Sequence, residues 1–137
     1  MTSPNDHDPN KGRPQGELNG LRVLIVEDSW DVATSLTRLL EAWGADVLGP
    51  VATAADALRL SSERTADAAL VDIKLRGGEE AYDLIDRLLD QGIRVVLMSG
   101  YADVSVVQGK VAAILQKPMK PDLLLQSLRS AQNKELQ

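Results

Sequence analysis

Polar side chains of the kinds that bind metal ions and phosphate follow four short apolar runs along this chain. They are Glu27 and Asp28 after Leu21–Val26, Asp72 after Ala68–Val71, Ser99 after Ile93–Met98 and Lys117 after Val111–Gln116. Short apolar runs bounded by turn residues are typical of strands that are buried on both faces. In an open parallel sheet, ligands bind beyond the carboxyl ends of the strands. We therefore expect these side chains to meet at one edge of a sheet.

Three of these side chains are carboxylates, which repel one another when they lie close together. A hard divalent cation relieves that repulsion, and Mg²⁺ suits a few carboxylates that leave positions open for water and phosphate oxygens. Beside such an ion, Asp72 is predicted to act as a nucleophile toward a phosphoryl group, giving an aspartyl phosphate. We expect Lys117 and Ser99 to bind oxygens of the transferred group, because its negative charge is spread over them.

The segments between these residues show helical patterns that alternate with the expected strands. Apolar residues recur at helical spacing after two expected N-caps, Ser29 and Thr53, and again from Ala81 and from Pro121. A further short strand is expected over 46–51, and the valine-rich segment 103–108 predicts at most a short helical turn. Five strands alternating with helices imply an α/β fold with a parallel sheet covered on both faces.

Composition narrows the class of protein. The chain has 137 residues, no cysteine and a net charge of −5, which indicates one domain without disulfides or zinc thiolates. The negative charge disfavours binding to nucleic acid or to an anionic membrane. No apolar run approaches the roughly 20 residues of a membrane span, and the N-terminus lacks the apolar core of a signal peptide. We expect a cytoplasmic protein.

The chain is expected to divide into a folded domain and two tails. Residues 1–20 are rich in Pro, Gly, Asn and Asp, and such a segment cannot offset its ordering entropy by burial. It is predicted to be a disordered tail. Residues 21–132 would form the domain, and residues 133–137 a short C-terminal tail.

In their order along the chain, Glu27-Asp28, Asp72, Ser99 and Lys117-Pro118 resemble the receiver domain of two-component response regulators. The resemblance covers about residues 21–131. The run 98–101 and the Gly-Gly pair after Asp72 are similar to small stand-alone receivers with a Thr-Gly-Tyr signature. The resemblance implies a flavodoxin-like, doubly wound sheet of five parallel strands in the order 2-1-3-4-5.

The resemblance also implies a role for each site residue. Asp72 would accept phosphate from a histidine kinase or a histidine phosphotransfer protein. Ser99 would sense the phosphoryl group, and Lys117 would pair with it and precede a cis peptide bond to Pro118. The ligands of Mg²⁺ would be Glu27, Asp28, Asp72 and the backbone carbonyl of Lys74. Such a protein assists its own phosphorylation and dephosphorylation and is otherwise not an enzyme.

The chain departs from the family pattern at Ile114, where many receivers carry an aromatic residue that turns inward on phosphorylation. Tyr101 and the segment 102–110 are therefore our candidates for transmitting the signal. The Lys74 side chain is either surface charge or a group that leans over the phosphoryl group. Because the chain ends soon after its last expected helix, the signal is expected to pass to an unidentified downstream protein by contact. A homodimer is the alternative partner that the sequence leaves undecided.

Two other functions compete with the phosphoacceptor. A pseudo-receiver would use the same fold as a binding module without phosphorylation, and the intact set of acids argues against it. A flavodoxin-like FMN-binding protein has the same topology but wants a Ser, Thr or Gly-rich phosphate loop after the first strand. Glu27 and Asp28 have the wrong charge for that loop.

Overall fold

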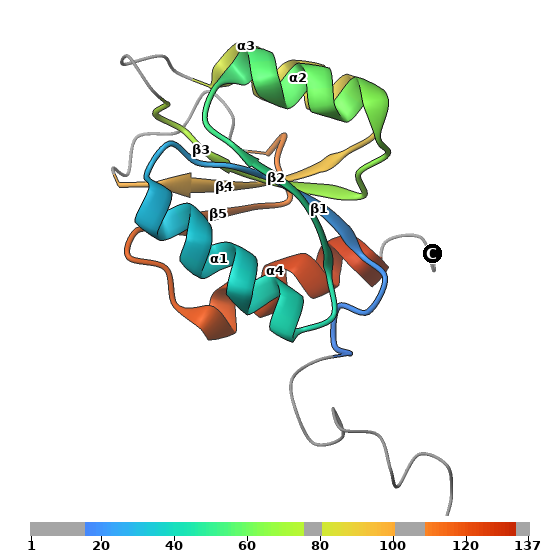
Figure 1. Ribbon diagram of the computed structural model, residues 1–137, viewed down its shortest axis with the longest axis vertical. Coiled ribbons are helices and arrows are strands. Elements are labelled where there is room, and N and C mark those ends of the chain that lie inside the picture. Colours follow the sequence, from blue (N-terminus) through green and yellow to red (C-terminus); the bar gives the residue numbers. More distant parts are fainter. Residues whose placement is uncertain (1–15, 76–80, 101–108, 134–137) are drawn as a thin grey trace, which may run out of the picture.

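A computed structural model describes residues 16–75, 81–100 and 109–133 of the chain. Within these ranges the elements follow in the order β1 (Arg22–Val26), α1 (Trp30–Ala42), β2 (Asp46–Val51), α2 (Ala54–Glu63), β3 (Ala68–Asp72), α3 (Tyr82–Asp90), β4 (Arg94–Ser99), β5 (Ala113–Gln116) and α4 (Pro121–Asn133). The strands pair in parallel in the order β2-β1-β3-β4-β5 (Figure 1). This confirms the predicted fold class and strand order. None of the helices in these ranges has the length and apolar character that a membrane crossing requires.

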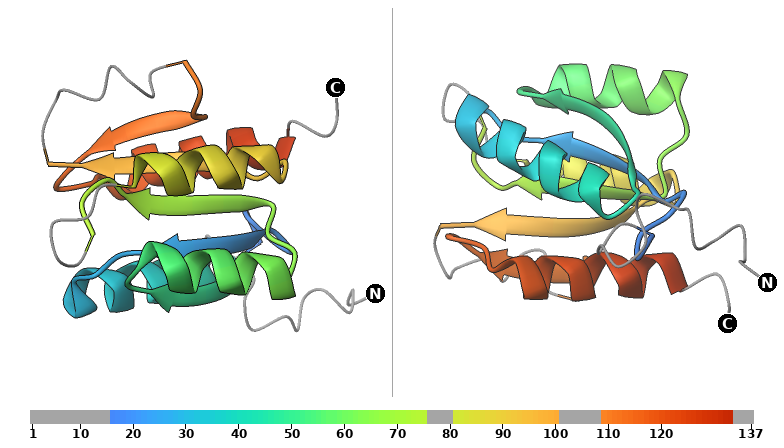
Figure 2. Two further views of the ribbon diagram at one scale, coloured as in Figure 1. Left: turned by 90° about the horizontal axis from the view of Figure 1, so that it is seen from above. Right: turned by 60° about the horizontal axis from the view of Figure 1, so that its bottom comes forward.

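Helices cover both faces of the sheet. α2 and α3 lie on one face, and α1 and α4 lie on the other (Figures 1 and 2). Along β1, Leu24 and Val26 join the core beneath α2 and α3, whereas Val23 and Ile25 join the core beneath α1 and α4. Successive side chains of a strand point to opposite faces. A continuous apolar run therefore supplies both cores, as the sequence predicts.

The two expected N-caps differ in the structure. Thr53 caps α2, because its side chain accepts a hydrogen bond of 3.1 Å from the Asp56 N–H. Ser29 precedes α1 but makes no side-chain capping bond. Its backbone N–H instead donates to the Glu27 carboxylate at 3.0 Å. The residue at this helix start thus orients a candidate site carboxylate with its backbone.

Residues 16–20 belong to the folded domain, which corrects the prediction that the disordered tail extends to residue 20. The N–H groups of Gly16 and Leu18 donate to the Trp43 carbonyl at 2.8 and 2.9 Å. The Leu18 side chain is fully buried in the core beneath α1 and α4. The polar, glycine-rich composition gave no sign of this contact. One buried leucine is enough to hold the turn, because the amides of the turn donate to a free carbonyl at the end of a helix.

Leu18→Ala is expected to lower the free energy of unfolding by about 2–4 kcal/mol, because it leaves a cavity in a closed core. Urea unfolding followed by circular dichroism measures the loss. Glu17→Ala is the matched control, because Glu17 is exposed and its carboxylate lies 3.5 Å from Arg129 in a surface ion pair. That change should cost less than about 1 kcal/mol. Equal losses in the two variants would contradict the placement of Leu18.

Asp67 joins the amino ends of β1 and β3. One of its oxygens accepts the Arg22 backbone N–H at 2.8 Å, and the other accepts from Arg22 Nη2 at 2.9 Å. Burial by itself would raise the pKa of Asp67, but the hydrogen bonds and charge of Arg22 outweigh it and hold that pKa below its usual value. The ionised carboxylate therefore stabilises the folded protein.

Asp67→Asn is expected to lower the free energy of unfolding by about 1–2 kcal/mol near neutral pH. Because the pKa of Asp67 is lower in the folded state, its contribution is complete above the unfolded-state pKa of about 3.9 and is lost as the pH falls through the folded-state value. Urea unfolding from about pH 7 to about pH 3 should therefore show the variant and the wild type converging. A difference that stays constant over this range would contradict the ionic contribution.

Asp46→Asn provides a control for this measurement. The Asp46 carboxylate lies 3.9 Å from Arg64 in an ion pair whose two side chains are about half exposed. An exposed pair of this length contributes little to stability. The change should therefore leave the free energy of unfolding nearly the same at each pH.

Candidate functional site

The carboxyl ends of two neighbouring strands bring three carboxylates together. β1 ends at Val26 and is followed by Glu27 and Asp28, and β3 ends at Asp72. The two strands pair with Val26 opposite Val71. One carboxylate oxygen from each of the three acids lies within 4.8 Å of the other two. The acids that the sequence predicts to meet at this edge do meet there.

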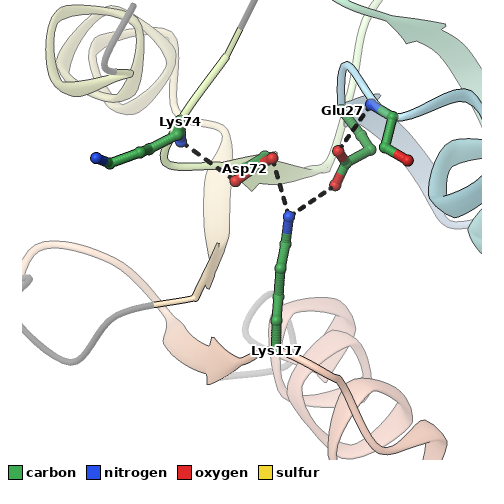
Figure 3. A network of polar contacts seen from close by, with 5 residues as sticks. Glu27, Asp72, Lys74 and Lys117 are labelled. Atoms are coloured by element: carbon green, nitrogen blue, oxygen red, sulfur yellow. Dashed lines mark hydrogen bonds and ion pairs between the residues drawn. The ribbon is translucent and has the colours of Figure 1, made fainter. Parts of the chain in front are cut away.

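Lys117 reaches two of these acids from the end of β5. Its Nζ lies 3.0 Å from Asp72 Oδ2, to which it donates a hydrogen bond, and 3.3 Å from Glu27 Oε1 (Figure 3). Burial alone would lower the pKa of Lys117, but the bond to Asp72 and the charges of both acids outweigh burial and raise that pKa. Lys117 is therefore charged at neutral pH.

The negative charge of Glu27 is unfavourable where this side chain lies. Its side chain is 1% exposed, and the contact of Oε1 within the described residues is the ion pair with Lys117 at 3.3 Å, without a hydrogen bond of good geometry. Burial and the negative charge of Asp72 raise the pKa of Glu27, although the Ser29 N–H and Lys117 oppose them. A buried carboxylate beside another carboxylate fits a hard cation such as Mg²⁺, because the cation offsets their mutual repulsion.

Asp72 is held in one orientation by bonds to both of its oxygens. Lys117 donates to Oδ2, and the Lys74 backbone N–H donates to Oδ1 at 3.2 Å. Figure 3 shows the Lys74 side chain extending away from Asp72, so it does not cover this carboxylate. Metal binding by the Lys74 carbonyl stays a prediction.

Ser99 ends β4 and is 1% exposed. It pairs with Gln116 of β5, and its carbonyl accepts the Lys117 N–H at 2.7 Å. The backbone of β4 thus holds the backbone of Lys117 in place. Phosphate binding by the Ser99 hydroxyl stays a prediction. The Lys117–Pro118 peptide is cis, as the resemblance implied.

Ile114, the departure from the family pattern, is part of the described structure, whereas the switch candidate is not. Ile114 lies in β5 and packs, partly buried, against the core beneath α2 and α3. The switch candidate Tyr101 lies outside the described residues, as does the segment 102–108. The contribution of Tyr101 to signalling therefore stays a prediction.

Sequence reasoning missed an apolar cavity beside Lys117. It has a volume of about 580 Å³, and its lining includes Val32 and Leu36 of α1 together with Met119 and Leu124. Trp30, at the start of α1, is 77% exposed. The apolar residues that follow Lys117-Pro118 could have indicated an apolar surface next to Lys117. Only the packing of α1 near α4 turns that surface into a cavity.

Comparison with known proteins gives consistent matches. The family model of the response regulator receiver domain matches residues 23–129. The phyllosphere-induced regulator PhyR of Methylorubrum extorquens is 28% identical over 114 residues, which are 80% of this chain and 43% of PhyR. The chain thus spans less than half the length of this curated relative.

Two solved structures have a similar fold, and in each case the match extends over almost the whole of the solved chain. The signal receiver domain of a modulated diguanylate cyclase from Desulfovibrio desulfuricans G20 has a TM-score of 0.77 and 31% identity, over 86% of this chain and 98% of that one. A CheY-like response regulator receiver domain protein from Methanospirillum hungatei JF-1 has a TM-score of 0.75 and 30% identity, with the same two coverages of 86% and 98%.

Proposed function

Because the chain belongs to the response regulator receiver domain family of two-component signalling, we propose that it is a phosphoacceptor that takes a phosphoryl group onto Asp72 in a reaction that depends on Mg²⁺. Receiver domains work with histidine kinases or phosphotransfer proteins, and we propose a protein of one of these classes as the donor. The observation that supports this proposal is the cluster of Glu27, Asp28 and Asp72, whose oxygens lie within 4.8 Å of one another beside Lys117.

Glu27, Asp28 and Asp72 would hold the Mg²⁺ ion, together with the backbone carbonyl of Lys74. The bound cation would supply positive charge that offsets the repulsion among the acids and the charge on the phosphoryl oxygens. This set fits the ion because it offers one oxygen from each of three carboxylates, all within 4.8 Å of one another, and Mg²⁺ prefers oxygen ligands. A pseudo-receiver would have no need of such a costly cluster.

The chemistry of transfer falls to Asp72. A carboxylate oxygen attacks phosphorus and forms the O–P bond, while the P–N bond of the donor phosphohistidine breaks and its electron pair stays on the imidazole. Lys117 Nζ, held 3.0 Å from Asp72 Oδ2, is placed to bind an oxygen of the transferred group as a positive point charge. The Ser99 hydroxyl is proposed to bind another.

The output is proposed to be a change in protein contacts. Phosphorylation would shift the population of conformers and so alter binding to a downstream partner, or favour a homodimer. On this proposal the protein works in the cytoplasm, and it assists only its own phosphorylation and dephosphorylation. Tyr101 is the residue we propose to transmit the change.

Incubation with acetyl phosphate and Mg²⁺ tests the proposal. Intact-protein mass spectrometry should show a gain equal to one phosphoryl group, and that gain should disappear when EDTA replaces Mg²⁺. A pseudo-receiver would show no gain under either condition. Absence of modification in a folded sample that contains Mg²⁺ would therefore favour the pseudo-receiver.

A further inference from the structure

A second cavity lies at the edge of the sheet opposite Asp72. It is formed where the amino ends of β1, β3 and β4 meet the last turn of α4 and the segment 16–20, and its volume is about 680 Å³. Pockets for small molecules commonly measure roughly 300–1,000 Å³. The polar residues of its lining include Asn19, Arg22, Thr65, Asp67 and Arg94. This cavity has no part in the proposed phosphoryl transfer.

Arg94 is the unusual residue of this lining. Its Nε is buried and has no hydrogen-bond partner within the residues that the structure describes. The backbone of Arg94 is fixed, because it begins β4 and its N–H donates to the Asp67 carbonyl at 3.2 Å. Nε itself is closed to the cavity, but Arg94 as a whole is only partly buried and lines the cavity, so an acceptor there would meet the two outer nitrogens of the guanidinium.

The one carboxylate among the described lining residues pairs with Arg22 and not with Arg94. Asp67 is the carboxylate of the lining, and both of its oxygens accept hydrogen bonds from Arg22. The charge of Arg22 is therefore balanced locally, whereas no carboxylate of residues 16–75, 81–100 or 109–133 forms an ion pair with Arg94. The Thr65 hydroxyl and the Asn19 amide add neutral hydrogen-bonding groups to the same lining.

We propose that this cavity binds a small molecule that carries a carboxylate or phosphate group, with Arg94 as the residue that anchors the anion. The planar guanidinium matches the oxygens of either group with parallel hydrogen bonds. Because the cavity and Asp72 lie at opposite ends of the strands, binding here requires neither Mg²⁺ nor phosphorylation. The proposal can therefore succeed or fail independently of the phosphoacceptor function.

Titration of the ¹⁵N-labelled chain without Mg²⁺ tests this proposal, with citrate and inorganic phosphate as separate probes. At least one probe should cause saturable chemical-shift changes centred on the amides of Gly20, Thr65 and Gly92, which line the cavity. Saturation by citrate alone would identify a carboxylate ligand, and saturation by phosphate alone a phosphate ligand. Arg94→Gln should weaken the binding at least tenfold.

Arg59→Gln is the matched control, because Arg59 is an exposed arginine of α2 that pairs with Asp56 away from the cavity. Its binding should equal that of the wild type. If Arg94→Gln fails to fold, Arg94→Lys keeps the charge without the planar fork and should bind severalfold more weakly. Shifts that grow linearly for both probes, shifts centred on Lys117, or unchanged binding in the Arg94 variants would overturn the proposal.

Discussion

Asp72→Asn protein is expected to gain no phosphoryl group from acetyl phosphate under conditions that fully modify the wild-type chain. The amide lacks the nucleophilic oxygen, so the rate should fall by a factor on the order of 10³ or more. Asparagine preserves the volume of Asp72 and an oxygen that can accept the Lys74 N–H, which donates at 3.2 Å in the wild type. Mass spectrometry of the intact protein over a time course measures the rate.

The control for this variant is Asp83→Asn. Asp83 lies in the first turn of α3 with its side chain 82% exposed. It should be modified at the wild-type rate. Circular dichroism of both variants checks that they fold. A phosphoryl gain that persists in folded Asp72→Asn would show that another residue accepts phosphate and would refute the assignment.

Glu27→Gln is expected to weaken Mg²⁺ binding at least tenfold and yet to stabilise the metal-free protein. The pKa of Glu27 is raised by burial and by the charge of Asp72, so its ionised form costs folding free energy at neutral pH. Glutamine removes that cost, and it still offers an oxygen to the Ser29 N–H. The same substitution removes a ligand of the ion.

Thermal unfolding with EDTA and with excess Mg²⁺ separates the two effects. In EDTA the variant should melt a few degrees above the wild type, since a change of about 1 kcal/mol moves Tm by roughly 2–8 °C in domains near this size. The increase in Tm caused by Mg²⁺ should be smaller in the variant, because ligand binding stabilises by mass action. Glu41→Gln, an exposed acid of α1, should behave as the wild type in both buffers. An equal Mg²⁺ increment in Glu27→Gln would exclude Glu27 as a ligand.

The sequence by itself determined the fold class and the edge at which the site forms. Each strand is a local apolar run such as Ala68–Val71. The residue that follows the run, here Asp72, lies at the strand end independently of how the rest of the chain packs. Parallel pairing then places all such residues at one edge. This is why the sequence alone predicts that the acids at positions 27, 28 and 72 meet.

Only the tertiary structure decided the partners of the individual atoms. Lys117 Nζ lies between Asp72 and Glu27 because β5 and the loop after it place it there, and no local pattern encodes that distance. Leu18 lies in a polar segment and is nonetheless buried, and Arg94 begins an ordinary strand and nonetheless has a buried Nε without a hydrogen-bond partner among the described residues. The physical reason is that hydrophobic periodicity depends on near neighbours in the sequence, whereas burial and charge compensation depend on residues that are distant in the chain and become neighbours only when the layers pack.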